Sequence, residues 1–206
     1  MSSDAKVFVI DDDPAARDSV AAVVQSKGVP VESYASAEDF LAAFDGATHG
    51  CIITDVRMTG MSGLDLQDAL RKRGISLPVV VITGFGDVPT AVRAMKAGAF
   101  SFLEKPCQNA ELWSAISAAL ESSSARRDEQ AQQHAIRRDL DTLTPDERRV
   151  LGAMVAGKPN KTVAAEFDLG LRTVELRRAN IMKKMHADSL ATLVRYALAA
   201  GVAPEA

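Results

Sequence analysis

Lys6-Val7-Phe8-Val9-Ile10-Asp11-Asp12-Asp13 is a short apolar run that ends in three acids. Three later runs of β-branched or aromatic residues also end close to a polar group: Cys51–Thr54 before Asp55, Val79–Ile82 before Thr83, and Phe100–Leu103 near Lys105. Apolar runs of this length are typical of buried parallel strands. The carboxyl ends of parallel strands share one edge of a sheet, where α/β proteins bind their ligands. We therefore expect these polar groups to meet at that edge.

Helix-like stretches separate the strands as far as about Glu121, and Val29–Tyr34 reads as a further strand. This alternation predicts a parallel sheet with helices on both faces. Asp13 followed by Pro14, and Ser36 three residues before Asp39, are typical helix starts. Residues 1–121 are thus predicted to form one α/β domain.

The segment 122–139 changes character, because it is rich in Ser, Gln, Arg and Glu and contains neither Pro nor Gly. This composition favours a helical extension or a solvated linker over a flexible tether. After Leu140 the strand pattern stops, and residues 140–206 are predicted to form a small all-α domain of four helices.

Helix signals are clear in this second part. Thr144-Pro145-Asp146-Glu147 combines an N-cap, a first-turn proline and an acid at the third helical position. Leu169-Gly170-Leu171 is expected to form a tight turn, and Thr173 to cap a helix that runs to about Met185. Two short helices joined by a glycine-containing turn predict a helix-turn-helix.

The composition is that of an ordinary soluble protein: 206 residues, 47% hydrophobic and 25% charged. We expect no membrane span and no signal peptide, because the sequence has no long apolar run and no apolar stretch before the first strand. Two cysteines, Cys51 and Cys107, cannot form a disulfide framework, which favours the reducing cytoplasm. From Leu140 onward the net charge is +2 (ten basic, eight acidic residues), against −5 before it, a mild asymmetry that suggests different partners.

The acids after the strands suit phosphoryl chemistry. Carboxylate oxygens can share a Mg²⁺ (or Mn²⁺) ion, and a carboxylate can itself be the nucleophile that accepts a phosphoryl group. Lys105 offers a positive charge to phosphoryl oxygens, and the Thr83 hydroxyl offers a hydrogen bond. For any single aspartate the alternative is a turn former or helix cap.

Four segments resemble the signature of two-component receiver domains: Val9–Asp13, Thr54–Met58, Val81–Gly84 and Phe102–Pro106. Gly86-Asp87-Val88-Pro89 and Ala94-Met95-Lys96-Ala97-Gly98-Ala99 are most similar to the FixJ branch. The resemblance implies a flavodoxin-like, five-stranded parallel sheet in the order 2-1-3-4-5.

The same resemblance assigns roles. Asp55 would accept a phosphoryl group from a histidine kinase. Metal ligands would be the carboxylates of Asp11 (through water), Asp12 and Asp55, with the backbone carbonyl of Arg57. Thr83 and Lys105 would bind the phosphoryl oxygens, Phe102 would be the aromatic switch residue, and Lys105-Pro106 would be a cis bond. From the sequence alone, Phe102 could equally be a core aromatic. Thr59 stands where the family usually has proline, which is expected to alter loop mobility without removing a ligand.

The predicted helix from Thr173 carries several basic residues, while Val174, Ile181 and Met185 fall on another face. Arg177, Arg178 and Lys184 could lie near one another on the basic face. A basic face opposite an apolar one suits a helix in a DNA groove. A solvated surface stripe is the alternative.

Leu143–Arg148, Gly157–Lys161, Arg172–Glu175 and Ala179–Met185 resemble a LuxR/FixJ-type helix-turn-helix. The resemblance implies that the helix from Thr173 is the recognition helix and that the last helix serves dimerisation. Arg177 stands where the family often has histidine, which leaves the target preference open. The expected DNA contacts are Lys161, Arg172, Thr173, Glu175, Arg177, Arg178, Asn180, Lys183 and Lys184.

Together these features identify the chain as a response regulator of the FixJ/NarL family. Its expected partners are a sensor histidine kinase, promoter DNA, RNA polymerase and, when phosphorylated, a second copy bound through the fourth helix, fifth strand and fifth helix. Two other classes share some features. An aspartyl-phosphate phosphatase would usually carry Asp-x-Asp-x-Thr after its first strand, unlike Asp11-Asp12-Asp13-Pro14. The second domain could instead bind protein or RNA.

Overall fold

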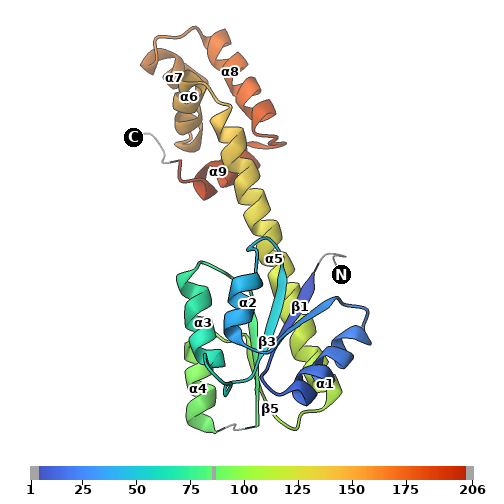
Figure 1. Cartoon of the computed structure of the whole chain (residues 1–206). Coiled ribbons are helices and arrows are strands. Elements are labelled where there is room, and N and C mark those ends of the chain that lie inside the picture. Colours follow the sequence, from blue (N-terminus) through green and yellow to red (C-terminus); the bar gives the residue numbers. More distant parts are fainter. Residues whose placement is uncertain (1–4, 85–86, 203–206) are drawn as a thin grey trace. The chain divides into compact units, whose positions relative to one another are not determined.

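The computed structural model describes residues 5–84 and 87–202 (Figure 1). Residues 1–4, 85–86 and 203–206, which include Gly86 of the FixJ-like motif and the outermost residues of both predicted domains, lie outside this description. The chain divides into two compact units, Met1–Arg127 and Asp128–Ala206. Each unit is described by itself.

The first unit is built on a sheet whose paired strands are all parallel and follow the order β2-β1-β3-β4-β5, which confirms the expected topology. The strands are β1 (Lys6–Ile10), β2 (Val31–Tyr34), β3 (Gly50–Thr54), β4 (Val79–Thr83) and β5 (Ser101–Glu104). The helices between them are α1 (Pro14–Gln25), α2 (Ala37–Ala43), α3 (Gly63–Lys72) and α4 (Val88–Lys96).

Alternate residues of each central strand belong to two different cores, because successive side chains of a strand point to opposite faces. On β1, Val7 and Val9 pack in the core that contains α1 and the start of the fifth helix. Phe8 and Ile10 pack in the other core, with residues of α2, α3 and α4. Helices therefore cover both faces of the sheet (Figure 1), and this double burial explains the nearly continuous apolar strand sequences.

Strand register aligns the carboxyl ends of the three central strands. Ile10 pairs with Thr54, and Thr54 pairs with Val81, so Asp11 and Asp55 leave neighbouring strands at the same level. Asp13 then caps α1 by accepting a hydrogen bond from the backbone amide of Ala15, as predicted. Chain direction and register together bring the acids to one edge.

Helix α5 (Asn109–Asp141) is a single helix that contains the whole segment 122–139, so the helical alternative predicted for this segment is the one found. In the first unit its polar residues contact the start of β3. The Ser123 hydroxyl oxygen accepts a hydrogen bond from the backbone amide of Gly50 at 3.2 Å, and an Arg127 guanidinium nitrogen lies 2.9 Å from Nδ1 of His49. These contacts stabilise the helical conformation of the polar segment after Ser122.

The second unit contains the end of α5 and four further helices around one core. The further helices are α6 (Pro145–Val155), α7 (Asn160–Glu166), α8 (Leu171–Lys184) and α9 (Leu190–Ala199). Thr144 and Glu147 form the predicted capping box of α6. The predicted cap of α8 is wrong: Gly170 is the N-cap and Thr173 lies inside the first turn. The reason is that the extended backbone of Gly170 lets the helix begin at once, without a side-chain cap.

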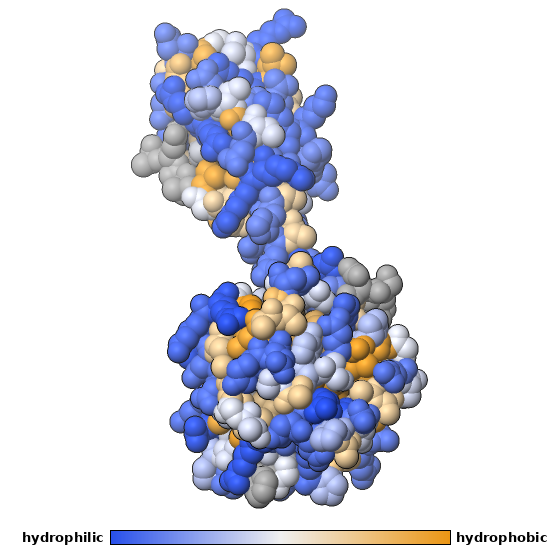
Figure 2. All heavy atoms as spheres, viewed as in Figure 1, coloured by the Kyte–Doolittle hydropathy of each residue, from blue (hydrophilic) through white to orange (hydrophobic). Residues whose placement is uncertain are grey.

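The visible face of each unit is mostly polar, with apolar residues in small separate groups (Figure 2). Within the described ranges 5–84 and 87–202, no helix has the length and apolar character needed to cross a membrane. The notable exposed apolar side chains lie on helices: Val88, Val92 and Met95 on α4, Leu171 and Leu176 on α8, and Leu190 and Leu198 on α9.

Candidate phosphoryl-accepting site and nucleic-acid interface

Lys105 joins two of the predicted acids at the carboxyl edge of the sheet. Its ammonium nitrogen lies 2.7 Å from Oδ2 of Asp11 and 2.9 Å from Oδ2 of Asp55. These residues come from the ends of β1, β3 and β5, which lie far apart in the sequence. Register and parallel direction thus bring together three of the groups that the sequence predicted would meet.

The Asp55 carboxylate is held at both oxygens. Oδ2 accepts from Lys105, and Oδ1 accepts a hydrogen bond from the backbone amide of Arg57 at 3.0 Å. Only 13% of the side chain is exposed, so it is oriented by the protein but can be reached from outside. Gly63 is required beside it, because a Cβ there would lie 2.2 Å from the Asp55 carbonyl oxygen.

Two acids share one cation in this partly buried site. Asp11 is buried and also accepts a hydrogen bond from the backbone amide of Asp13. Burial by itself would lower the pKa of the Lys105 ammonium, but the hydrogen bonds from it to Asp11 and Asp55 outweigh burial and raise that pKa. Lys105 therefore stays protonated at neutral pH, and the site keeps an excess of negative charge.

Asp12 is bound to the loop that follows Asp55. Its Oδ2 accepts two hydrogen bonds from Thr59, one from the backbone amide at 2.9 Å and one from the hydroxyl at 2.8 Å. The hydroxyl and then the amide of Thr59 hold the pKa of the Asp12 carboxyl below its usual range. The Thr59 departure therefore does more than alter loop mobility, since a proline at this position would provide neither donor.

The donors at this edge suit a magnesium ion. They are hard oxygen atoms, and a single ammonium offsets the charge of the carboxylates of Asp11 and Asp55. Asp12 follows Asp11 directly. Over residues 5–84 and 87–202, however, no three acidic, His or Cys side chains are already gathered in an arrangement that could hold a metal ion. The residue types fit the ion, and the side chains would have to rearrange to bind it.

The predicted sensing residues lie at the ends of β4 and β5. Thr83 is fully buried, and its backbone carbonyl accepts a hydrogen bond from the Lys105 amide at 2.8 Å. Phe102 is partly exposed and packs against the core that contains α2, α3 and α4. The Lys105-Pro106 bond is cis, as the family resemblance implied.

The outward face of α8 carries part of the predicted DNA-contact set. The exposed members are Arg172, Thr173, Glu175, Asn180 and Lys183, and Lys161 is exposed on α7. Val174 and Ile181 are fully buried on the opposite side. Leu176 is 62% exposed on the same outward stripe as Arg172 and Lys183, a feature that sequence reasoning missed although the helical spacing of these residues indicates it.

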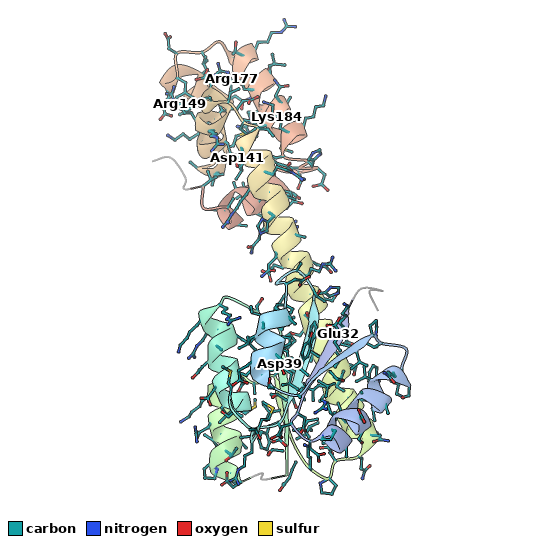
Figure 3. The ribbon with its side chains drawn as sticks, viewed as in Figure 1. Glu32, Asp39, Asp141, Arg149, Arg177 and Lys184 are labelled. Atoms are coloured by element: carbon teal, nitrogen blue, oxygen red, sulfur yellow. The ribbon has the colours of Figure 1, made fainter. Side chains whose placement is uncertain are left out.

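Arg177 and Lys184 are arranged differently from the predicted basic face. Figure 3 labels Arg177 and Lys184 on α8. Arg177 pairs with Asp146 at 2.6 Å, and Lys184 pairs with Glu147 at 2.6 Å, so both contact the first turn of α6. The reason is helical geometry: both residues lie beside the buried stripe of α8 and not opposite it. Arg178 is likewise only partly exposed. The cationic surface of α8 is thus narrower than its sequence suggests.

The ion pair between Lys184 and Glu147 contributes to the stability of the fold, because the Glu147 carboxylate is buried. The Glu147 side chain is 8% exposed, and it also accepts a hydrogen bond from the Thr144 backbone amide at 2.8 Å. Lys184, and then the Thr144 amide, hold the pKa of the Glu147 carboxyl below its ordinary value of 4.5. A lowered carboxyl pKa stabilises the fold above that ordinary value, and this stabilisation is lost as the pH falls through the lowered pKa.

We expect Lys184→Gln to destabilise the second unit at neutral pH by about 1–3 kcal/mol, because the buried Glu147 carboxylate would lose its positively charged partner. Hydrogen exchange of the α6 and α8 amides in the full-length protein measures this loss. Lys183→Gln is the control, since Lys183 is exposed in the same turn. The difference between Lys184→Gln and the wild type should shrink as the pH falls from 4.5 through the lowered pKa of the Glu147 carboxyl, because the ion pair is lost there in the wild type as well. Equal exchange in both variants at neutral pH would contradict a structural role for Lys184.

Comparison with known proteins supports both units. A family model described as the response regulator receiver domain matches residues 7–117, and one described as bacterial regulatory proteins of the luxR family matches residues 141–197. The transcriptional regulatory protein FixJ of Azorhizobium caulinodans is 47% identical over 198 residues, which are 96% of this chain and 94% of that protein.

Two solved structures are similar over nearly the whole chain. Response regulator StyR has a TM-score of 0.85 at 38% identity, covering 95% of this chain and 98% of its own. Full-length FixJ from B. japonicum has a TM-score of 0.59 at 41% identity, covering 96% of this chain and 97% of its own. The chain therefore belongs to the FixJ branch of the two-component response regulators, in which a receiver domain is joined to a LuxR-type DNA-binding domain, and it is a phosphorylation-dependent transcriptional regulator.

Proposed function

We propose that Asp55 is the phosphoacceptor and that its phosphorylation raises the affinity of the protein for promoter DNA. The observation that carries this proposal is the shared Lys105 ammonium, because it fixes the Asp55 carboxylate beside Asp11 at the open edge of the sheet. The domains would be the receiver (1–121), a helical connection (122–139) and the DNA-binding domain (140–206). The protein would act in the cytoplasm, as a switch and not as an enzyme.

In the proposed transfer, an Asp55 carboxylate oxygen attacks the phosphorus atom of a phosphohistidine on the sensor kinase. An O–P bond forms as the P–N bond of the donor breaks, which leaves an acyl phosphate on Asp55. The departing ring nitrogen keeps the electron pair of the P–N bond, and with a proton on one of its two ring nitrogens the kinase histidine leaves as a neutral imidazole. The Arg57 amide and the Lys105 ammonium orient the attacking carboxylate, and Lys105 then faces the new phosphoryl oxygens. The Thr83 hydroxyl would donate a hydrogen bond to another of these oxygens.

A divalent cation would be held by Asp11, Asp12, Asp55 and the backbone carbonyl of Arg57. When bound, Mg²⁺ or Mn²⁺ offsets the charge of the carboxylates and of the incoming phosphoryl group. The support for this assignment is the excess of hard, anionic oxygen donors over positive charge at the strand ends. Asp11 would act through water, since its carboxylate is buried and bound to Lys105.

Phosphorylation would change the surface formed by α4, β5 and α5, with Thr83 and Phe102 as the residues that move. This surface would then bind a second phosphorylated receiver. Its support is an apolar stripe on α4, where Val88 is 78% exposed and Val92 and Met95 follow at four and seven residues. Exposed apolar side chains at this spacing form one helix face that lacks a partner within the described receiver.

The second unit would place α8 in the major groove, with Arg172, Asn180 and Lys183 among the groups that contact DNA. Two such units would bind half-sites about one helical turn apart. On α9, Leu190, Val194 and Leu198 line a shallow apolar groove, which supports this helix as a dimer contact on DNA. RNA polymerase would be a further partner at the promoter.

Phosphoryl transfer can be tested without the kinase. Full-length protein incubated with acetyl phosphate and Mg²⁺ should gain one phosphoryl group, located on Asp55 by tandem mass spectrometry. Removal of divalent ions with EDTA should abolish this gain, because the carboxylates would then repel the incoming anion. Transfer to another residue, or transfer that is unaffected by EDTA, would contradict the proposal.

A further inference from the structure

Thr59 is engaged with Asp12 in a way that bears on metal binding. Both Thr59 donors, the backbone amide and the hydroxyl, point at the same oxygen, Oδ2 of Asp12. A carboxylate oxygen offers two lone pairs, so these hydrogen bonds occupy both acceptor positions of Oδ2. A cation that uses this oxygen therefore has to displace at least one Thr59 donor.

The Thr59 loop is anchored independently of Asp12. The backbone amide of Met61 donates a hydrogen bond to Oε1 of Glu38, at the start of α2, at 2.9 Å. One residue later, Ser62 caps α3 and shares a capping box with Asp65. These anchors restrain the loop, so we expect movement of the Asp12 carboxylate toward Asp11 and Asp55 to break at least one of its hydrogen bonds to Thr59.

Asp11 and Asp55 are drawn together by Lys105, whereas Asp12 is held by the loop. This division agrees with the absence of a ready-made group of three ligating side chains among the residues that the structure describes. We propose that Thr59 restrains Asp12 in the metal-free receiver and competes with the divalent cation for it. The inference rests on the metal site proposed above and adds a residue that sets its affinity.

The competition follows from the residue at this position. Proline, which the family usually has here, lacks an amide hydrogen and a hydroxyl, so it cannot hold Asp12 in this way. Valine keeps the shape and the amide but removes the hydroxyl, and serine keeps both donors. The three substitutions therefore separate the hydroxyl, the amide and the general effect of changing the residue.

Calorimetric titration of the full-length protein with MgCl₂ at neutral pH tests the inference. Thr59→Val should bind Mg²⁺ about two- to tenfold more tightly than the wild type, because the cation would no longer have to displace the hydrogen bond from the Thr59 hydroxyl to Asp12. Thr59→Pro should gain at least as much, and Thr59→Ser should match the wild type. Thermal melts by circular dichroism confirm that each variant is folded.

The failures are distinguishable. If the wild type binds Mg²⁺ and Thr59→Val binds it equally or more weakly, the competition is disproved and the metal site stands. If neither protein binds Mg²⁺, the proposed metal site fails and the inference fails with it. Asp12→Asn should weaken binding in both backgrounds, and unchanged affinity on this substitution would show that Asp12 is not the ligand for which Thr59 competes.

Discussion

Replacement of Asp55 by asparagine is expected to abolish phosphorylation, and with it any dimerisation that phosphorylation causes. The amide keeps the size of the carboxylate but is not a nucleophile that can form an acyl phosphate. Acetyl phosphate should convert the wild type into dimers, measured by light scattering coupled to size-exclusion chromatography, and should leave Asp55→Asn unchanged. The expected difference is the complete loss of the phosphorylation-dependent dimer fraction.

Asp68→Asn is the matched control for this experiment. Asp68 lies on α3 of the same domain, where it forms an exposed ion pair with Arg71 at 2.8 Å. Exposed pairs of this kind contribute little to stability, so the variant should fold and respond like the wild type. If Asp55→Asn still dimerises on addition of acetyl phosphate, the role assigned to Asp55 is disproved.

The largest effect on DNA binding is expected from the double variant Arg172→Gln, Lys183→Gln. Both side chains are exposed on the outward stripe of α8, eleven residues apart, which returns them to nearly the same direction around the helix. Loss of two phosphate contacts should weaken duplex binding by about 10- to 100-fold and reduce the slope of log K against log salt by about 2. Fluorescence anisotropy over a range of salt concentrations measures both quantities.

The matched control removes the same charge elsewhere in the second unit. Arg137 and Arg138 on α5 are both exposed and lie outside the helix-turn-helix. Arg137→Gln, Arg138→Gln should change the salt slope much less than the α8 variant. Equal slopes for the two double variants would show that general charge, and not the outward face of α8, accounts for DNA binding.

Much of the receiver fold could be predicted from its sequence, because the apolar runs and the polar residues that follow them indicate the same arrangement of strands. Short apolar runs ending in Asp11, Asp55 and Thr83 predict buried parallel strands, and parallel strands place their carboxyl ends together. The observed register, with Ile10 opposite Thr54, realises this arrangement. The contact of Lys105 with both acids could therefore be predicted, although Lys105 lies 94 positions after Asp11 and 50 positions after Asp55 in the sequence.

Contacts that depend on side-chain direction could not be predicted in the same way. Thr59 and Asp12 are 47 positions apart, and no local pattern indicates that both donors would point to one oxygen. On α8, the sequence did not indicate which of the basic residues face solvent and which contact α6. Lys184 forms an ion pair with Glu147, which lies 37 positions earlier in the sequence, and this pairing depends on the packing of α6 against α8.

Helix boundaries depended on similarly weak preferences. Thr173 is a better N-cap residue than glycine in isolation, yet α8 begins at Leu171, because the turn through Gly170 already has the extended backbone of a cap. The polar segment 122–139 allowed either a helix or a solvated linker. Its contacts with the receiver, such as that of Ser123 with the Gly50 amide, favour the helix and are not visible in local composition.

The most direct test is a titration of full-length wild-type protein, with and without acetyl phosphate treatment, against a duplex selected from a random pool by the phosphorylated protein. Phosphorylated protein should bind the duplex about 5- to 150-fold more tightly, the range of typical coupling free energies between two sites. Asp55→Asn should show the unphosphorylated affinity under both conditions. Equal affinity of the phosphorylated and unphosphorylated wild type would contradict the proposal that phosphorylation of Asp55 controls DNA occupancy.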